Sequence, residues 1–268
     1  MERFQEPSLN RSKITVITVC LNSAQTIRET LASVASQSYD HLEHIIIDGS
    51  SRDGTIEIVR SWRRHPVRCI SEPDRGIFDA MNKGLELATG DIVGMLNSDD
   101  VYYDADILKK VAEIMSDPDV DACYADLIYV AKSQPNKIVR FWKSCPFAPG
   151  LFATGWVPPH PTFFARRRLY DRFGLFDLNY SLAADYELMA RFLEKFKIHA
   201  VYVPQIFVKM RQGGVSNKNL SNIIKQNLEI YKALKKNNVP FFLPKFFLMK
   251  LMTKIKQYSS KPPLERWS

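Results

Sequence analysis

Two adjacent carboxylates, Asp99 and Asp100, follow the apolar segment 91–96, which has the composition of a buried strand. Neighbouring carboxylates repel each other, and each resists removal from water. A divalent cation relieves both effects, because Mn²⁺ and Mg²⁺ prefer oxygen ligands and often lie between carboxylates and substrate phosphates. The pair therefore predicts a site for Mn²⁺ or Mg²⁺ beside a phosphorylated substrate. A solvated turn, with an Asp capping the next helix, is the simpler alternative.

A second segment whose side chains could bind a ligand, 71–76 (SEPDRG), contains Asp74 and Arg75. It precedes a predicted helix that carries Asn82. Arg75, beside the positive end of that helix's dipole, suits a nucleotide or a phosphate. Asp74 is able to accept hydrogen bonds from a ribose or a base. Considered alone, the segment is more typical of an ordinary turn at the start of a helix.

A third acid, Asp185, begins the predicted helix 184–196, whose inward face is apolar. A carboxylate in this place could act as a general base, or it could be a charge that the helix dipole favours. The dipole tends to lower the pKa of the carboxyl, whereas a base works best near the operating pH. The catalytic role therefore requires burial to offset the dipole.

Two loops of the second half carry further candidates. His160 lies in the proline-rich segment 146–161, where it could meet a sugar or a diphosphate, although a loop histidine is more often structural. Arg211 precedes Gly213 and Gly214, and a basic side chain on a flexible loop suits closure over a diphosphate. An ordinary turn is again the alternative.

Alternating strands and helices in the first half must position these residues. The predicted strands are 14–20, 44–48, 67–71 and 91–96. The first predicted helix has Ile27, Leu31 and Val34 on its inward face, and further helices are predicted at 55–62, 76–88 and 104–115. The inward face of 76–88 carries Ile77, Met81, Leu85 and Ala88. Such units predict a mostly parallel sheet with right-handed crossovers. Because ligands of these sheets bind beyond the carboxyl ends of the strands, the residues that follow strands should line one site: Asn22, Asp48, Asp74, Asp99 and Asp100.

The second half is less regular. Strands are predicted at 120–130, 138–142, 162–164 and 199–203, and helices at 184–196 and 221–236, with a loop or lid over 146–161. Four separated cysteines without a CxxC pair favour a reducing compartment. The polar N-terminus and the lack of a run of about 18 apolar residues predict a cytoplasmic protein.

The positive charge of the chain is concentrated near its C-terminus. Residues 205–268 contain 13 Lys/Arg and 2 Asp/Glu, a net charge of +11, which leaves −3 on the preceding 204 residues. A nucleic-acid-binding surface would normally carry the positive charge on the folded body, so no nucleic acid is expected. Segment 239–258, rich in Phe, Leu, Met and Lys, predicts a peripheral anchor on an anionic membrane surface. A helix packed on the core or on another subunit is the alternative.

Seven segments resemble, in the same order, the motifs of family-two glycosyltransferases with the GT-A fold. They are ITVITVCLNSAQTIRETLASVASQSY, IIIDGSSRDGT, SEPDRGIFDAMNKGLELATGD, LNSDD, PPHPTFF, AADYELMARFL and VKMRQGGVSN. The resemblance spans about 13–217 and is closest to bacterial enzymes that build O-antigen, colanic acid or capsule. It implies an α/β, Rossmann-like nucleotide-binding fold with a mostly parallel central sheet flanked by helices.

The resemblance also implies a role for each matching position. The nucleotide-sugar contacts would be Thr18, Asn22, Asp48 (at the base), Asp74, Arg75, Asn82, Asp99 and Arg211. Asp100, together with Asp99, would bind Mn²⁺ or Mg²⁺, and Asp185 occupies the place of the catalytic base. Further candidate contacts to the acceptor or diphosphate are His160, Gly213 and Gly214. The sequence departs from many relatives at Asn97, where they have Asp, and at Ala184, where they have Glu.

The implied reaction transfers a sugar with inversion from a nucleotide sugar, a UDP-sugar in the first instance, to a saccharide carried on a polyprenyl diphosphate. The implied organisation is an extension (1–12), a nucleotide-sugar-binding half (13–118), an acceptor-binding half (119–217) and a basic tail (218–268) on the cytoplasmic face of the inner membrane. Two alternatives remain. A nucleotidyltransferase would be expected to have a Gly-rich, basic loop after the first strand, and a binding module leaves the acids at the strand ends unexplained.

Overall fold

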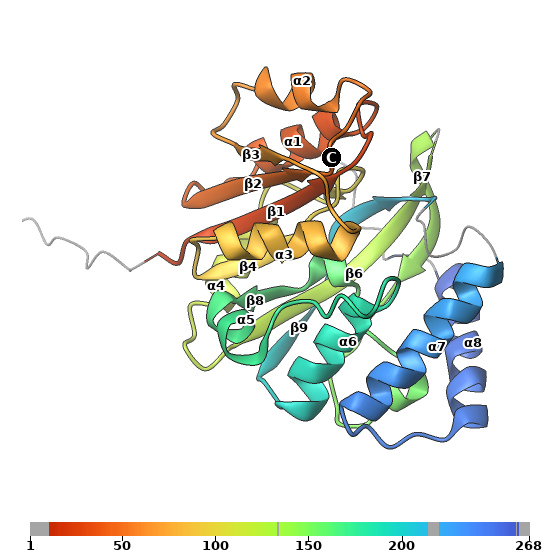
Figure 1. Cartoon of the computed structure of the whole chain (residues 1–268). Coiled ribbons are helices and arrows are strands. Elements are labelled where there is room, and N and C mark those ends of the chain that lie inside the picture. Colours follow the sequence, from red (N-terminus) through yellow and green to blue (C-terminus); the bar gives the residue numbers. More distant parts are fainter. Residues whose placement is uncertain (1–10, 133, 214–219, 261, 263–268) are drawn as a thin grey trace, which may run out of the picture.

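The computed structural model describes residues 11–132, 134–213, 220–260 and 262. Its centre is a nine-stranded sheet in the order β3-β2-β1-β4-β8-β6-β9-β5, with β7 paired to β6 (Figure 1). The strands are β1 (Ile14–Cys20), β2 (Leu42–Asp48), β3 (Arg68–Ser71), β4 (Ile92–Met95), β5 (Val101–Tyr102), β6 (Ala122–Ala131), β7 (Gln134–Trp142), β8 (Phe164–Arg166) and β9 (Ala200–Arg211).

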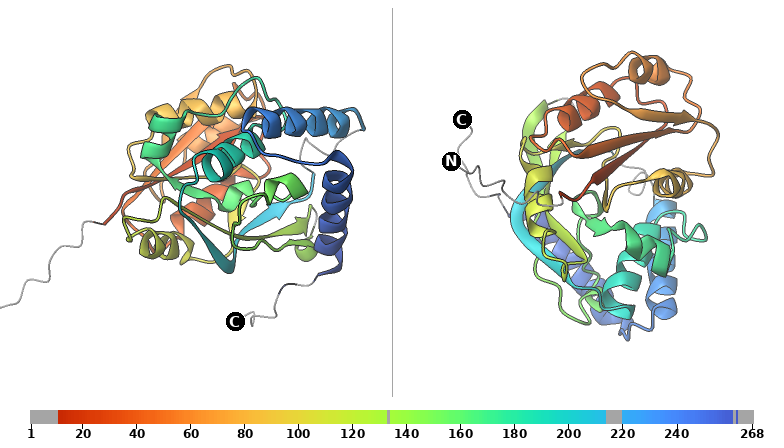
Figure 2. Two further views of the ribbon diagram at one scale, coloured as in Figure 1. Left: turned by 90° about the horizontal axis from the view of Figure 1, so that it is seen from below. Right: turned by 90° about the vertical axis from the view of Figure 1, so that its left-hand side faces the viewer.

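Helices cover the sheet, which is curled (Figure 2). They are α1 (Ile27–Ala35), α2 (Thr55–Arg60), α3 (Ile77–Leu87), α4 (Ile107–Ile114), α5 (Arg167–Phe173), α6 (Ala184–Ala190), α7 (Leu220–Lys236) and α8 (Leu243–Ser259). A π-helical turn, Arg191–Lys195, continues α6, and short 3-10 turns occur at Phe152–Thr154 and His160–Thr162. The predicted strands and helices are present with shifted ends, whereas β5 and α5 were not expected.

The predicted α/β fold is confirmed, but the sheet is parallel only in part. β1 pairs in parallel with β2 and β4, β2 with β3, and β6 with β9. The pairs β4–β8, β6–β8, β6–β7 and β5–β9 are antiparallel. Hydrophobic patterns indicate where strands occur and leave their directions open, so the first half matches the expectation and the second half is mixed.

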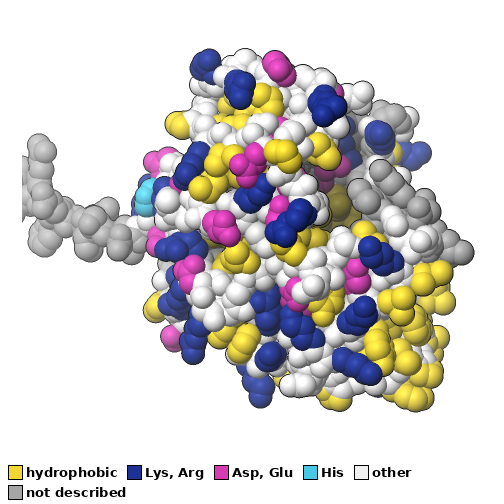
Figure 3. All heavy atoms as spheres, viewed as in Figure 1, with side chains coloured by type: hydrophobic (Ala, Val, Ile, Leu, Met, Phe, Trp, Pro, Cys, Tyr) yellow, Lys and Arg dark blue, Asp and Glu magenta, His cyan; other side chains and the backbone are white. Residues whose placement is uncertain are grey.

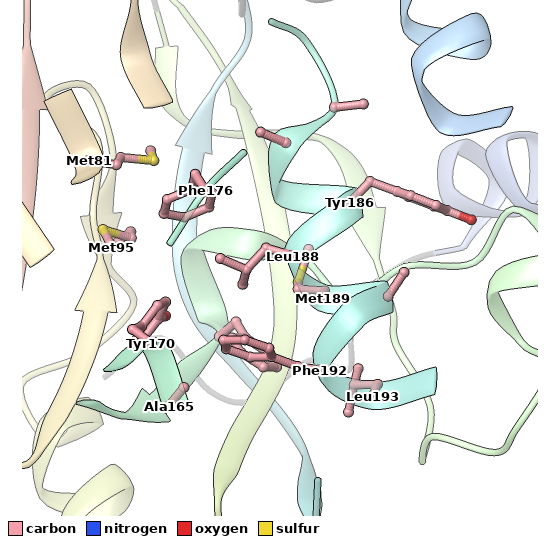
Figure 4. Packing of buried hydrophobic residues seen from close by; sticks show 14 of the residues in the cluster. Met81, Met95, Ala165, Tyr170, Phe176, Tyr186, Leu188, Met189, Phe192 and Leu193 are labelled. Carbon is pink, nitrogen blue, oxygen red and sulfur yellow. The ribbon is translucent and has the colours of Figure 1, made fainter. Parts of the chain in front are cut away.

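Two large hydrophobic cores lie on opposite faces of the sheet, as expected for strands covered on both sides. All seven residues of β1 are buried. One core gathers side chains of α3, α5, α6 and α7, and the other gathers those of α1 and α4. In Figure 4, Leu188 of α6 and Phe192 of the π-helical turn that follows it project toward the side on which Met95 and Ala165 of the strands lie.

α3 packs closely on β1, with one departure from its predicted inward face. A Cβ at Gly84 would lie 2.4 Å from Cγ2 of Ile17, so only glycine allows this approach. Met81 and Leu85 are buried as predicted, but Ile77 is 46% exposed. A helical side chain covers the turn that precedes its own Cα, and Ile77, the first residue of α3, has no preceding turn to cover.

The C-terminal helices pack on the body of the protein. α7 contacts α6, and α8 contacts β7 and the turn at Phe152–Thr154. The predicted boundary at residue 217 stays a prediction, and α7 beyond it contributes Ile230, Ala233 and Leu234 to the core shared with α6. Across the part of the chain that the structure describes, no helix is both long and apolar enough to span a bilayer.

Candidate active site

Three of the predicted nucleoside contacts, Asn22, Asp48 and Asp74, lie where the parallel strands β1, β2 and β3 end (Figure 1). Asp48, the last residue of β2, is fully buried, and its carboxylate accepts hydrogen bonds from the hydroxyls of Ser51 and Ser71. The Ser51 hydroxyl in turn accepts a bond of 2.7 Å from the N–H of Asn22, which has a φ of 51°. Asp48 therefore joins the ends of three neighbouring strands.

Asp74 belongs to the same group of residues. Its carboxylate accepts a hydrogen bond of 2.8 Å from the N–H of Gly76. It also lies against Gly49, where a Cβ would be 2.4 Å from the Asp74 Oδ2 atom, so only glycine permits this approach. The structure thus brings Asn22, Asp48 and Asp74 together, as expected for residues at the carboxyl ends of parallel strands. Their contacts to a nucleoside stay predictions.

Thr18 lies inside the sheet, two residues before the end of β1. Its hydroxyl forms a hydrogen bond of 3.0 Å with Nε2 of His44, and Nδ1 of His44 lies 2.9 Å from Nε2 of His65. Burial, with a smaller effect of His65, lowers the pKa of His44 to about 3, so this ring is neutral. Thr18 is therefore part of a buried polar chain and is not grouped with the strand-end residues.

Arg75 and Asn82 also have protein partners. The Arg75 guanidinium pairs with Oδ1 of Asp79 at 2.8 Å, and the Arg75 side chain is 77% exposed. Asn82 uses both ends of its amide on the backbone of one residue: Nδ2 donates to the carbonyl of Phe176, and Oδ1 accepts from the N–H of Phe176, each at 2.9 Å. Asn82 therefore fastens the loop before α6 to α3, while the Arg75 side chain is largely exposed to solvent.

The loop that carries Asp99 and Asp100 is held by three hydroxyls from α1 and the turn before it. The bonds join Ser23 to Ser98 (2.8 Å), Thr30 to the carbonyl of Asp100 (2.9 Å) and Ser33 to the N–H of Tyr102 (2.7 Å). Because α1 also buries Ile27, Leu31 and Val34 in the core, the loop is fixed to a rigid element. The acid pair therefore has a defined position before any ligand binds.

The two carboxylates are withdrawn from water. Burial raises the pKa of Asp99, and burial followed by repulsion from Asp99 raises the pKa of Asp100 well above its ordinary value. The side chain of Asp100 is 0% exposed, and its Oδ2 accepts a bond of 3.1 Å from Nδ2 of Asn97. The Oδ1 atoms of Asp100 and Asn97 are both buried and have no hydrogen-bond partner.

Such oxygens fit a divalent cation, which accepts carboxylate and amide oxygens as ligands. Unsatisfied buried oxygens are otherwise unfavourable by about 1–3 kcal/mol each. Among the described residues, no group of three or more His, Cys, Asp or Glu side chains could hold a metal. A cation at Asp100 would therefore need ligands from a bound substrate or water, as Mg²⁺ and Mn²⁺ sites on phosphates commonly have.

Arg211 lies beside the acid pair because β5 and β9 run antiparallel. Val101 is opposite Lys209 in this pairing, which brings the residues just before Val101 next to the end of β9. The charge of Arg211 opposes part of the rise in the pKa of Asp99. Its side chain is 14% exposed and forms an ion pair with Glu29 of α1. The predicted Arg211–diphosphate contact stays a prediction. The structure adds Glu29, whose carboxylate would have to share the Arg211 guanidinium with the diphosphate.

The other predicted loop residues are in different settings. His160 is buried, burial lowers its pKa to about 4, and its ring packs edge-on against Phe176 at 5.5 Å between centroids. Gly213 is exposed with a φ of 131°, a conformation that favours glycine. Gly214 lies outside the described residues. A contact between any of the three and the substrate stays a prediction.

Asp185 is the second residue of α6 and keeps part of its surface exposed. Desolvation of the carboxyl by the surrounding protein raises the pKa of Asp185 to about 6, and the charge of Glu229 acts in the same direction. The N–H of Tyr186, which donates to Oδ1 at 2.8 Å, opposes the rise. Desolvation thus exceeds the effect of local hydrogen bonding. The resulting pKa suits a carboxylate that takes up a proton near neutral pH.

Tyr129 of β6, which the sequence did not single out, connects the two groups of acids. Burial raises the pKa of its phenol to about 12, and the charges of both Asp100 and Asp185 add to the rise. The charges of Asp100 and of the candidate base Asp185 thus both act on this phenol. Its ring stacks on Trp142 at 6.5 Å between centroids, and the Arg140 guanidinium lies 4.6 Å from the ring centre. No local pattern marks Tyr129, since it stands in an apolar strand.

Comparison with known proteins identifies the class that this fold and site define. A family model described as glycosyl transferase family 2 matches residues 15–173, and the chain belongs to this family. An uncharacterised glycosyltransferase of Mycobacterium tuberculosis is 31% identical over 180 residues, which are 66% of this chain and 68% of that protein. A PGL/p-HBAD biosynthesis glycosyltransferase of the same species is 29% identical over 206 residues, 75% of this chain and 78% of that protein.

Solved structures support the GT-A fold. The mannosyltransferase PcManGT from Pyrobaculum calidifontis, in complex with GDP-Man and Mn²⁺, aligns over 93% of this chain and 81% of its own, with a TM-score of 0.59 and 20% identity. Residues 1–349 of S. aureus TarS, in complex with UDP-GlcNAc, align over 90% of this chain and 71% of that chain, with a TM-score of 0.65 and 19% identity. The protein is thus a family-two glycosyltransferase with a GT-A fold.

Proposed function

We propose that this protein is an inverting, metal-dependent glycosyltransferase that uses a nucleotide sugar, with a UDP-sugar as the first candidate. The observation that carries the proposal is the buried acid pair, where the Oδ1 atoms of Asp100 and Asn97 have no hydrogen-bond partner. The charges of Asp100 and Asp185 also both act on the phenol of Tyr129. The strand-end residues Asn22, Asp48 and Asp74 lie beyond the first three strands and suit a nucleoside.

In the proposed reaction, Asp185 accepts the proton of an acceptor hydroxyl. The oxygen forms a bond to the anomeric carbon of the donor sugar as the bond from that carbon to the nucleoside diphosphate breaks on the opposite face. Asp185, with a pKa of about 6, is ionised at neutral pH and ready to accept this proton. Arg211, beside the acid pair, is placed to balance charge on the departing diphosphate.

The residues that would hold the cation are Asp99 and Asp100, with the free Oδ1 atoms of Asp100 and Asn97 as the supporting observation. A bound Mn²⁺ or Mg²⁺ supplies positive charge that stabilises the leaving diphosphate. The presence of Mn²⁺ in the PcManGT complex favours the same use here.

A panel of nucleotide sugars with Mn²⁺ tests the donor. We expect at least one UDP-sugar to raise the melting temperature and to be hydrolysed slowly, because its diphosphate completes the cation site. UDP alone should give part of the thermal shift, and neither effect should survive chelation of the metal. Turnover of a nucleoside triphosphate with a sugar phosphate would instead favour a nucleotidyltransferase, and a lack of response to every donor would contradict the proposal.

We further propose that the enzyme works at the cytoplasmic face of the inner membrane on a saccharide linked to a polyprenyl diphosphate. One side of α8 packs on the protein through Phe246 and Gln257, and the opposite side is exposed. Figure 3 shows hydrophobic side chains gathered over α7 and α8. The exposed apolar residues here are Ile223, Ile224, Leu228, Phe242, Leu243, Phe247, Leu248, Leu251, Met252, Ile255 and Tyr258.

The lysines of α8 divide between the exposed side and the interior. Lys250 points inward, where its Nζ donates to Oδ1 of Asn227 at 2.6 Å and burial lowers its pKa to about 8. Lys245, Lys254 and Lys256 are exposed. An apolar face with exposed lysines suits the boundary of an anionic bilayer. Both the packed helix and the anchor expected from the sequence thus find support, on opposite sides of α8.

Flotation with liposomes that contain anionic lipid tests the membrane proposal. The triple variant Leu248→Ser, Leu251→Ser, Ile255→Ser should reduce the bound fraction about tenfold or more, since each side chain loses apolar contact worth on the order of 1 kcal/mol. The double variant Leu178→Ser, Phe196→Ser, which changes exposed apolar residues elsewhere, is the control. Unchanged binding of the triple variant would contradict the anchor, and a change in oligomeric state would assign this face to a subunit contact.

A further inference from the structure

α7 delivers a carboxylate to the start of α6, the helix that carries Asp185. Oε1 of Glu229 accepts hydrogen bonds from the N–H of Ser181 at 3.1 Å and from its hydroxyl at 2.9 Å. Oε2 accepts from the N–H groups of Leu182 at 2.8 Å and Ala183 at 3.0 Å. Glu229 is only 6% exposed. Four donors of one short segment thus converge on a single buried side chain, 46 to 48 residues away in the sequence.

The helix N-cap before α6 supplies no side-chain acceptor for the N–H groups of this segment. α6 begins after Ala183, which has no side-chain oxygen to cap the helix. The first N–H groups of a helix and of the turn before it need acceptors, and negative charge is favourable at this end. In most helices a local Ser, Thr, Asp or Asn supplies the acceptor. Here the acceptor comes from α7, outside the matched family region 15–173.

The position of Glu229 bears on the base directly. Asp185 stands two residues after Ala183, so Glu229 fixes the backbone segment that leads directly into Asp185. The far end of the same helix is fastened separately, because Glu194 accepts hydrogen bonds from the N–H groups of Gly150 and Phe152. The start of α6 therefore depends on Glu229, while its continuation is held by other contacts.

We propose that Glu229 is a positioning residue for the base Asp185, so that turnover requires α7 to be docked on the start of α6. The inference rests on the proposed function, in which Asp185 takes the acceptor proton. The scarcity of acids in this strongly basic segment was a signal available in the sequence, since residues 205–268 contain only two, Glu229 and Glu265.

Other contacts keep α7 in place when Glu229 is changed. Lys236 pairs with Asp177 at 2.7 Å and with the buried Glu187 at 3.0 Å. Asn237 donates to Oε1 of Glu187 at 3.3 Å, and α7 also contributes apolar side chains to the core. The variant Glu229→Gln keeps the shape of the side chain, but its amide NH₂ group faces donors. It should therefore loosen the start of α6 without releasing α7.

The first test compares kinetics of Glu229→Gln with those of the parent enzyme. We expect kcat to fall about 10- to 100-fold, because a displacement of about 1 Å is enough for such a loss. The KM for the donor and the thermal shift caused by UDP should stay unchanged, since the acid pair and the strand-end residues lie elsewhere. The matched control is Glu86→Gln, an exposed glutamate of α3, which should leave kcat unaltered. A kcat within twofold of the parent would overturn the proposal.

A double-variant cycle distinguishes positioning from a general structural role. If Glu229 acts through Asp185, the variant Glu229→Gln, Asp185→Asn should be no slower than Asp185→Asn alone. Multiplied losses would show that Glu229 acts independently of the base and would overturn the proposal. Should Glu229→Gln fail to fold, Ser181→Ala, which removes one of the four bonds, enters the same cycle with a smaller expected loss. Near-normal turnover of Asp185→Asn would instead overturn the proposed function.

Discussion

Replacement of Asp185 by asparagine is expected to lower kcat by about 10²- to 10⁴-fold, the usual contribution of a positioned general base. The amide has nearly the same shape and can keep the bond from the Tyr186 N–H, so the fold should not change. It cannot take up the acceptor proton. Donor binding should persist, because the strand-end residues and the acid pair are untouched.

The same residue predicts how the rate depends on pH. The pKa of Asp185 is raised to about 6, above its ordinary value of 3.8, and only the ionised form can accept a proton. The rate should therefore be nearly constant above about pH 7 and should fall tenfold per pH unit once the pH is well below 6. If the rate instead falls only near pH 4, the carboxylate is more solvated during catalysis than in the structure.

Steady-state kinetics with a responding donor, together with UDP-induced thermal shift, provide the measurement. The control Asp40→Asn changes an exposed carboxylate whose side chain is 79% accessible, and its kcat should equal that of the parent. If Asp185→Asn retains more than about a tenth of the parent kcat, Asp185 is not the base. Loss of both turnover and the UDP shift would indicate a collapse of the donor site and would equally contradict the assignment.

The grouping of the strand-end residues could be predicted because one geometric rule connects sequence to space. Parallel strands end at a common edge, so Asn22, Asp48 and Asp74 come together wherever the fold is α/β. Asp99 and Asp100 also follow a buried strand, β4, and a hydrophobic pattern is enough to find it. The rule says nothing about direction in the second half, where short strands pair in both senses and the sequence pattern is the same for each.

The hydrogen-bond partners of the side chains could not be predicted from the sequence. Asn82 bonds to the backbone of Phe176, and Thr18 bonds to His44, although both residues occupy positions that the family resemblance assigns to the donor. Glu229 reaches the start of α6 from an element far away in the chain, and the phenol of Tyr129 is affected by the charges of Asp100 and Asp185, which are also distant in the sequence. Such contacts depend on how strands and helices are packed against one another, which residue type and spacing do not specify.

The different roles proposed for the acid pair and for Asp185 follow from the different surroundings of these carboxylates. Asp100 is buried beside another carboxylate, a setting that opposes ionisation unless a cation is present. Asp185 has no acid next to it in the sequence, and its pKa of about 6 allows it to exchange a proton. Similar side chains thus suit different tasks, cation binding at one and proton transfer at the other.

Asp100→Asn is accordingly expected to abolish metal-dependent turnover, with a loss of at least about 10²- to 10³-fold in kcat, as for removal of other groups that stabilise a leaving charge. The loss should not come from unfolding. Asp100 and Asp99 repel each other in a buried setting, and asparagine removes one of the two charges while keeping the shape. In the presence of a chelator, the variant should therefore melt at the same temperature as the parent or at a higher one.

Thermal unfolding with and without Mn²⁺ separates the two effects. For the parent with UDP, Mn²⁺ at about 100 times its Kd should add about 2.7 kcal/mol of stability, a shift of roughly 5–10 °C. Asp100→Asn should lose most of this shift, and the exposed control Asp119→Asn should keep it. A variant that keeps both the Mn²⁺ shift and turnover would remove Asp100 from the cation site. A variant that melts several degrees lower in chelator would show that the carboxylate serves the fold instead.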